Sequence, residues 1–175
     1  MRRRELEHII RAAGAVAAVD AVAVVGSQAI LASHPDAPDE LLASREADVY
    51  PIEKPHLADL IDGAIGEGSP FEEEFGYYAH GVGPETAVLP PGWAARTVEI
   101  CNENTRGVRG VCLHAVDLAI SKLAAGRDKD IEFVRGLLAH GYVSAAQIRE
   151  NASGLDAPHR ELVLARMRDR LGASP

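Results

Sequence analysis

The stretch of sequence that decides the fold is VAVVGSQAIL, which runs from Val22 to Leu31. Its first part, Val22–Val25, is a continuous apolar run with branched residues, which is typical of a strand covered on both faces. Gly26 and Ser27 end this run, and residues 28–33 have the composition of a short helix. A Gly-Ser turn at a helix start can hold a phosphate, because backbone N–H groups there attract anions.

A second segment, SREADVY, covers residues 44–50 and begins about one supersecondary unit later. It places Glu46 and Asp48 two residues apart, so both carboxylates share one face if the segment is extended. Like carboxylates on one face repel each other, and a divalent metal ion relieves that repulsion. Each feature alone has a bland explanation, a common turn or a solvated edge strand. In this order and spacing, they indicate a site for a metal-bound nucleotide.

The composition is that of a globular protein. The 175 residues, 47% of them hydrophobic, are enough for one core, or for one core with a helical extension. The net charge of −8 argues against a protein that coats nucleic acid, which normally has a basic face. Neither a signal peptide nor a membrane span is evident, so we expect a cytoplasmic protein without membrane contact. Cys101 and Cys112 lack metal-ligand spacing and are expected to be two buried thiols.

Hydrophobic periodicity predicts helices and strands in the first part of the chain and helices alone in the last part. The expected helices cover residues 3–18, 28–33 and 55–65, and the expected strands cover residues 22–25, 46–50, 71–82, 95–100 and 108–113. Four further helices are expected from residue 115 to residue 171. This layout predicts an α+β fold, with a core of residues 1–113 and a C-terminal helical region of residues 114–175 packed on it as one compact unit.

These motifs resemble those of the nucleotidyltransferase superfamily, which has the DNA polymerase β-like catalytic fold. The resemblance rests on the Gly26-Ser27 turn after a strand and on the carboxylate–x–carboxylate strand about twenty residues later. Residues 117–130, DLAISKLAAGRDKD, are similar to a stretch of small prokaryotic nucleotidyltransferases, which include abortive-infection toxins and minimal nucleotidyltransferase antitoxins. The resemblance covers roughly residues 20–140 and implies a mixed β-sheet flanked by helices.

The resemblance also implies roles for particular residues. Gly26 and Ser27 would bind the nucleotide triphosphate, and Glu46 with Asp48 would ligate Mg²⁺. Lys122 would reach the phosphates of the bound nucleotide. The mouth of this nucleotide cleft would contain Arg127, Lys129 and Asp130. The alternatives are structural: Lys122 is then a solvated helix position, and residues 127–130 form a charged turn between helices.

The sequence departs from the family pattern at two places. Glu46 stands where the family usually has Asp, and the longer side chain moves the carboxylate by about 1.5 Å, which matters because Mg²⁺ requires strict geometry. The third carboxylate, which should activate the attacking hydroxyl, has no clear counterpart. Glu99 on the fourth expected strand is one candidate; the third expected strand offers His80, and residues 72–74 are more remote acidic positions.

The leading hypothesis is an enzyme that transfers a nucleoside monophosphate from an NTP to a hydroxyl of a small molecule, a protein or RNA, with Mg²⁺ as the cofactor. The second hypothesis is a catalytically degenerate protein of the same fold that acts as a binding or regulatory partner, for example in a toxin–antitoxin pair. A third is a structural homodimer without a ligand.

Overall fold

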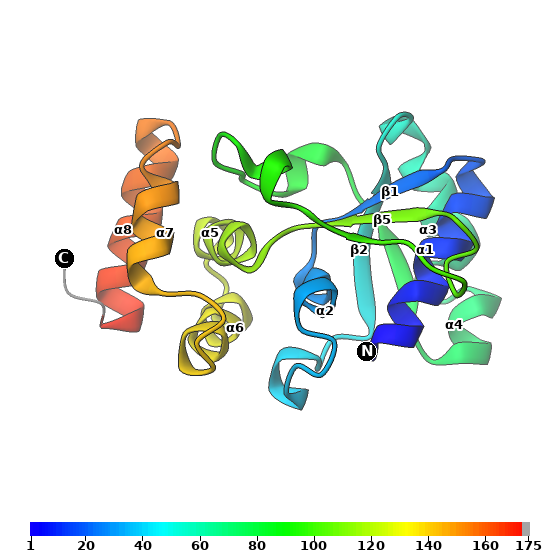
Figure 1. Ribbon diagram of the computed structural model, residues 1–175, viewed down its shortest axis with the longest axis horizontal. Helices are drawn as coiled ribbons and strands as arrows, with labels where there is room; N and C mark the ends of the chain where they lie inside the picture. Colours follow the sequence, from blue (N-terminus) through cyan, green and yellow to red (C-terminus); the bar gives the residue numbers. More distant parts are fainter. Residues whose placement is uncertain (173–175) are drawn as a thin grey trace. The chain divides into compact units, whose positions relative to one another are not determined.

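A mixed β-sheet forms the centre of the first part of the chain in this computed structural model, which describes residues 1–172 (Figure 1). In this part of the chain the sheet has five strands in the order β3-β2-β1-β5-β4. The strands are β1 (Ala21–Val24), β2 (Glu46–Pro51), β3 (Tyr78–Gly81), β4 (Val98–Ile100) and β5 (Arg109–Cys112). Strands β1 and β2 are antiparallel, as are β4 and β5, whereas β1–β5 and β2–β3 are parallel. The expected α+β fold is therefore confirmed.

Strand β1 lies in the middle of the sheet, and all four of its residues are buried. The apolar run Val22–Val25 predicts this position, because a central strand meets protein on both faces. The chain then forms a 3₁₀ turn at Ser27–Ala29 and helix α2 (Ile30–Ser33), which together match the expected short helix.

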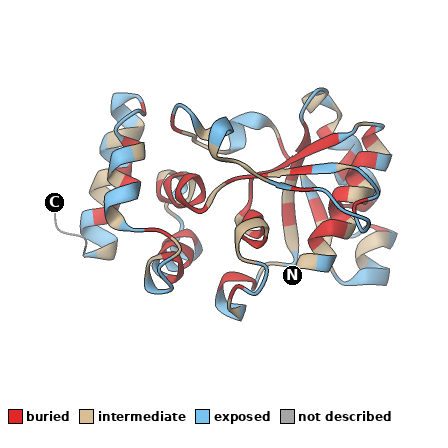
Figure 2. Ribbon diagram, in the orientation of Figure 1, coloured by how far each residue is buried: buried red, intermediate tan, exposed pale blue. Residues whose placement is uncertain are grey.

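Helices α1 (Arg3–Ala17) and α3 (Ala58–Ile65) contact each other and the strands of the sheet (Figure 1). The buried side of α1 repeats at helical spacing, so its apolar residues share one face. Figure 2 shows this burial along the strands and the helices. The fully buried residues of α1 are Leu6, Ile9, Ile10 and Ala13.

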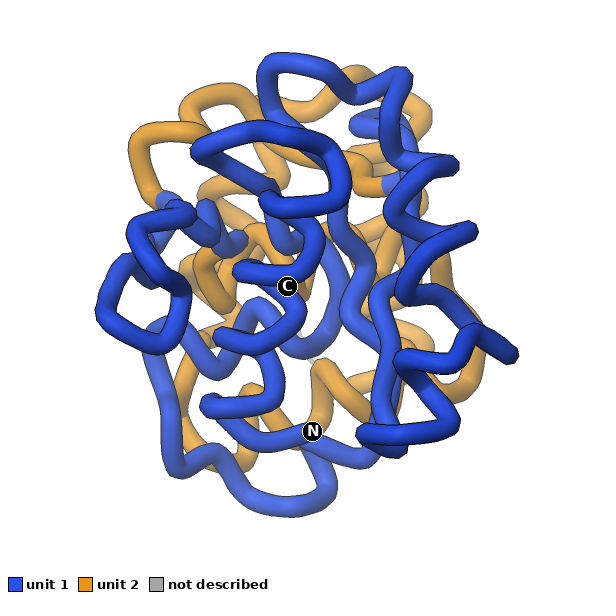
Figure 3. The backbone as a smooth tube through the Cα atoms, turned by 90° about the vertical axis from the view of Figure 1, so that its right-hand side faces the viewer, with its two compact units in different colours: residues 1–86, 97–113 blue, residues 87–96, 114–175 orange. Residues whose placement is uncertain are grey.

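By contacts within the chain, the protein divides into two compact units (Figure 3). Unit 1 contains residues 1–86 and 97–113, and therefore the whole sheet. Unit 2 contains residues 87–96 and the residues from His114 onward. The segment 87–96 thus belongs with the C-terminal helices, which its place in the sequence does not indicate.

Unit 2 is built from the four expected helices, as far as the structure describes it. They are α5 (Ala115–Ala125), α6 (Asp128–Ala139), α7 (Ala145–Ala152) and α8 (Ala157–Leu171). Their ends carry ordinary signals: the Ser144 hydroxyl caps α7, the Asp156 carboxylate caps α8, and Gly126 ends α5 with a φ of 72°. No helix in the described chain is long and apolar enough to cross a membrane.

One expected strand is partly wrong, because Phe71–Phe75 is helical. Helix α4 (Pro70–Phe75) occupies this segment, and β3 begins only at Tyr78. Ser69 caps the helix by accepting a hydrogen bond from the Glu72 N–H at 3.3 Å, and Gly76 ends it with a φ of 76°. A serine cap and a proline in the first turn therefore start a helix inside a segment that was expected to be a strand.

The expected strand over residues 95–100 is also shorter in the structure. Trp93–Arg96 forms a 3₁₀ turn, and β4 begins at Val98. Both cysteines are free, but Cys101, which directly follows β4, is exposed while Cys112 is buried. The expectation of two buried thiols is therefore wrong for Cys101.

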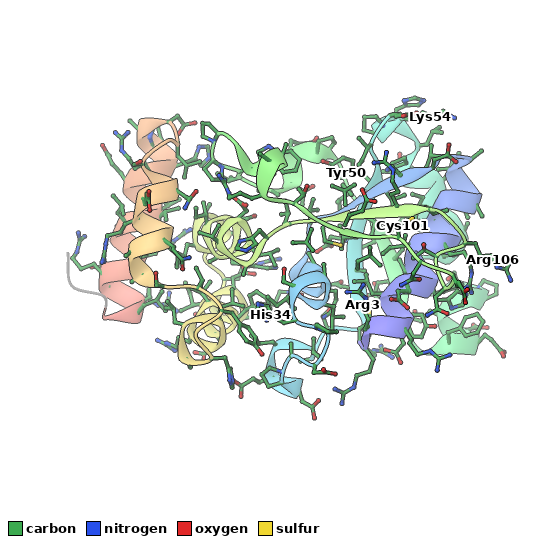
Figure 4. All side chains as sticks on the ribbon, in the orientation of Figure 1. Arg3, His34, Tyr50, Lys54, Cys101 and Arg106 are labelled. Carbon is green, nitrogen blue, oxygen red and sulfur yellow. The ribbon has the colours of Figure 1, made fainter. Side chains whose placement is uncertain are left out.

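Buried polar contacts connect α1 to other elements of unit 1. The Glu7 carboxylate is almost fully buried and accepts hydrogen bonds from Arg3 at 2.9 Å, from Asn102 at 2.9 Å and from Asn104 at 2.8 Å. Arg3, labelled in Figure 4, also donates to the Leu31 carbonyl at 2.6 Å. Burial alone would raise the pKa of Glu7, but these hydrogen bonds hold it below its usual value.

The packing of α3 on β3 yields a prediction about stability. A Cβ added at Gly81 would lie 2.1 Å from the Ala58 carbonyl oxygen, so Gly81→Ala requires a backbone shift and is expected to lower the free energy of unfolding by about 1–3 kcal/mol. The control is Gly63→Ala on the exposed side of α3, where a Cβ meets nothing within 4 Å. Alanine favours helix there, so stability should rise by about 0.5–1 kcal/mol.

Urea unfolding midpoints of the wild type and the two variants measure this difference. A Gly81→Ala protein as stable as the wild type would contradict the close packing of β3 against α3.

Candidate functional site

Antiparallel pairing of β1 with β2 places the Gly-Ser turn against Asp48. The ladder continues past β1, because the Val25 N–H donates to the Asp48 carbonyl at 3.0 Å. Gly26 follows at once and is buried. A Cβ at this position would lie 2.2 Å from the Asp48 Oδ2, which no real contact permits. Asp48 can therefore hold this position only with a glycine at residue 26, because the backbone passes directly beside its carboxylate.

Glu46 and Asp48 share one face of β2. The strand alternates, with Ala47 and Val49 fully buried on the opposite face and the two acidic residues half-buried. The Asp48 side chain is 22% exposed, so a small ligand can reach it from solvent. This face of β2 therefore presents two carboxylates beside the Gly-Ser turn.

Each of these carboxylates is paired with a residue of β3 in register. Glu46 lies opposite Tyr78, whose hydroxyl donates to the Glu46 Oε2 at 3.2 Å. Asp48 lies opposite His80, whose Nδ1 is 3.0 Å from the Asp48 Oδ1. Burial, together with the charge and hydrogen bond of Glu46, raises the pKa of Tyr78 to about 12, so this hydroxyl keeps its proton at neutral pH.

Glu99 does not join this group. It lies on β4, the opposite edge strand from β3, and strands β1 and β5 separate it from β2. Its carboxylate is half-exposed and lies 3.4 Å from Arg109. The residue beside Asp48 is instead His80, and within residues 1–172 no group of three or more His, Cys, Asp or Glu side chains is arranged to hold a metal ion.

The remote acidic positions 72–74 belong to α4, outside β3. The Glu72 carboxylate accepts a hydrogen bond from the Gly68 N–H at 2.7 Å and lies 3.4 Å from Arg45. It therefore helps to form the start of α4.

The basic residues that the sequence analysis selected lie in unit 2. The Lys122 Nζ is 3.3 Å from the Asp130 Oδ1, and the Lys122 side chain is only 15% exposed. Arg127 donates to the same carboxylate, through Nε at 2.6 Å and Nη2 at 3.1 Å. Lys129 is exposed in the first turn of α6. Lys122 is thus a half-buried partner of Asp130, not a fully solvated helix position.

Asp130 connects α5 to the start of α6 through these two cations. Its carboxylate is almost fully buried. Burial alone would raise the pKa of Asp130, but the hydrogen bonds from Arg127 and the positive charges of Lys122 and Arg127 hold it below its usual value.

An ion pair between Arg96 and Asp117 was not predicted from the sequence. Asp117 is completely buried, and its carboxylate accepts from the Arg96 Nε at 3.0 Å and from Nη2 at 2.6 Å. This two-point contact ties the segment 87–96 to α5 within unit 2. The signal in the sequence was an acidic residue on the apolar side of a helix, since such a charge needs a partner.

The ionised Asp130 carboxylate is expected to stabilise the protein in a pH-dependent way. Asp130→Asn leaves the half-buried Lys122 without its anion and should lower the free energy of unfolding at pH 7 by about 3 kcal/mol. Because the folded pKa of Asp130 lies below the usual value of 3.8, this stabilisation is complete above that value and is lost as pH falls through the folded pKa.

Urea unfolding of wild type and Asp130→Asn between pH 7 and pH 3 tests this expectation. The difference between the two proteins should shrink below about pH 4. A difference that stays constant over the whole range would show that the charge of Asp130 does not matter.

Comparison with known proteins places the chain in a family. The family model described as "Nucleotidyltransferase of unknown function (DUF6036)" matches residues 4–152. Comparisons with curated proteins and with solved structures gave no match. The match covers well over half of the chain and includes both the Gly-Ser turn and the acidic strand. The chain therefore belongs to this family of the nucleotidyltransferase superfamily.

Proposed function

We propose that this protein transfers a nucleoside monophosphate from an NTP to a hydroxyl group, at a site formed by the Gly-Ser turn and the acidic face of β2. The family supports the general kind of activity. The observation that carries the assignment to this site is the close approach of Gly26 to the Asp48 carboxylate. A phosphate on the turn and a cation on the carboxylate would then be neighbours, which a metal-bound triphosphate requires.

The residues present fit Mg²⁺. This ion prefers oxygen ligands and is usually bound by one or two carboxylates together with substrate phosphates and water. Glu46 and Asp48 provide two such carboxylates on one accessible face. When bound, Mg²⁺ would neutralise the charge of the triphosphate and of the departing pyrophosphate.

The chain's own groups would bind and orient the triphosphate. The backbone at Gly26 lies beside Asp48 without a side chain between them, and the half-buried Ser27 supplies a hydroxyl and an N–H at the start of the 3₁₀ turn. In the reaction, the acceptor oxygen forms a bond to the α-phosphorus, and the bond to the pyrophosphate oxygen breaks. The acceptor is a hydroxyl of a small molecule, a protein or RNA.

A phosphate-binding role for Lys122, Arg127 and Lys129 remains a proposal that rests on the family resemblance. Lys122 and Arg127 both contact Asp130 in unit 2. If Lys122 and Arg127 bind phosphate, Asp130 would hold both side chains in position for that contact.

A second function is favoured by the residue beside Asp48. His80 is in register with Asp48, at a place where a third carboxylate would help to deprotonate the acceptor hydroxyl. The protein would then bind a nucleotide without transferring it, and act as a regulatory partner of another protein, for example in a toxin–antitoxin pair. Transfer of label from NTPs radiolabelled at the α-phosphate to any acceptor would rule out this second function.

Thermal unfolding tests whether the site binds a magnesium nucleotide. Each of the four NTPs is added with Mg²⁺ or with EDTA. At a hundredfold excess over its Kd, the NTP that binds should stabilise the wild type by about 2.7 kcal/mol, which raises the melting temperature by roughly 5–10 °C. This stabilisation should appear only with Mg²⁺. Asp48→Asn and Glu46→Gln remove one carboxylate charge each with little change in shape, and both should abolish the shift.

Glu99→Gln is the matched control, because it makes the same chemical change on the opposite edge strand of the sheet. It should retain the wild-type shift. Absence of a shift with any NTP, or an unchanged shift in Asp48→Asn and Glu46→Gln, would refute the proposed site.

A further inference from the structure

Strand β3 supplies a hydrogen-bonding group for each carboxylate of β2. We propose that Tyr78 and His80 are positioning residues that hold Glu46 and Asp48 for the metal ion, and that Tyr78 in particular makes a glutamate usable at residue 46. The inference rests on the proposed function, because it concerns how the same two carboxylates are prepared for Mg²⁺.

The register of the two strands explains why these pairs form. In the parallel pair, Glu46 lies opposite Tyr78 and Asp48 lies opposite His80, so the four side chains share one face of the sheet. An ionised carboxylate only accepts hydrogen bonds, so the Tyr78 hydroxyl and the His80 Nδ1–H must both donate. The distances of 3.2 Å and 3.0 Å fit such donation.

Glutamate at residue 46 needs such a partner more than aspartate would. Its side chain has one more rotatable bond, and ordering it for a metal ion costs conformational entropy. A hydrogen bond from Tyr78 to Oε2 restricts that freedom before the ion binds. A carboxylate has about four lone-pair sites, and the hydrogen bond from Tyr78 uses one of them. Hydrogen-bond partners of metal ligands typically change metal affinity by about 10–100-fold.

The inference makes the effect of Tyr78 depend on the length of the side chain at residue 46. In Glu46→Asp the carboxylate withdraws by about 1.5 Å, beyond hydrogen-bonding reach of a hydroxyl that is already 3.2 Å away. Tyr78→Phe should therefore weaken Mg²⁺ binding in the wild type and have little effect in a Glu46→Asp background. A tyrosine that only helps to pack β3 would give the same change in both backgrounds.

Tyr77 provides the matched control. It precedes Tyr78 in the chain, and its hydroxyl is 2.8 Å from the His8 Nδ1. Its ring packs with those of Phe71 and Phe75, so the hydroxyl belongs to a different contact in the same unit. Tyr77→Phe therefore removes the same atom without touching Glu46 or Asp48.

The experiment measures the Mg²⁺ concentration that gives half of the thermal stabilisation by a triphosphate analogue that cannot be cleaved at the α-phosphate. The full chain is used as wild type, Tyr78→Phe, Tyr77→Phe, Glu46→Asp and Glu46→Asp/Tyr78→Phe. This concentration should rise about tenfold in Tyr78→Phe, stay within twofold of the wild type in Tyr77→Phe, and be nearly equal in the last two proteins. His80→Ala, at a half-exposed position, should also raise it about tenfold.

Melting temperatures without Mg²⁺ and nucleotide show which variants fold, and His80→Ala tests the role of β3 even if Tyr78→Phe does not fold. A magnesium requirement unchanged by both Tyr78→Phe and His80→Ala would overturn the inference while the proposed function stands. The inference also fails if Tyr77→Phe has the same effect as Tyr78→Phe, or if Tyr78→Phe acts equally in both backgrounds. If the wild type shows no magnesium-dependent stabilisation, the proposed function fails and this inference fails with it.

Discussion

The close contact between Gly26 and Asp48 constrains the candidate site more than any other interaction. It follows from the antiparallel pairing of β1 with β2, which continues through the hydrogen bond between Val25 and the Asp48 carbonyl. The pairing brings the end of a fully buried strand beside a half-buried carboxylate. Any side chain at residue 26 would fill the space between the turn and the carboxylate, so the observed position of the Asp48 side chain, and with it the proposed chemistry, depends on a glycine there.

Local patterns in the sequence were sufficient to predict most helices, the central strand and the shared face of Glu46 and Asp48, because these depend on periodicity and on end signals near in sequence. Helix α4 was missed because residues 71–82 were predicted as a single strand, although a serine cap and a proline precede residue 71. The separation of Glu99 from Asp48 is not visible in the sequence for another reason. Strand order places β4 at the far edge of the sheet, and order depends on long-range pairing that a single sequence does not reveal.

Charged residues show the same division between local and long-range information. The family resemblance assigns Lys122 and Arg127 to the nucleotide site, but the sequence does not show that both contact the buried Asp130. It gave no partner for Asp117, which Arg96 reaches from 21 residues away. In each case a partner is needed because an unpaired charge in a protein interior has a high free energy. Packing then decides which residue lies near enough to be that partner.

The central claim is that the Gly-Ser turn and the acidic pair of β2 form one site for a magnesium nucleotide. A crystal structure of the protein with Mg²⁺ and a non-hydrolysable NTP analogue tests it most directly. The account predicts an Mg²⁺ ion bound by Glu46 and Asp48, with the triphosphate in contact with Gly26 and Ser27. A nucleotide bound elsewhere, or a metal ion that neither carboxylate contacts, would contradict it.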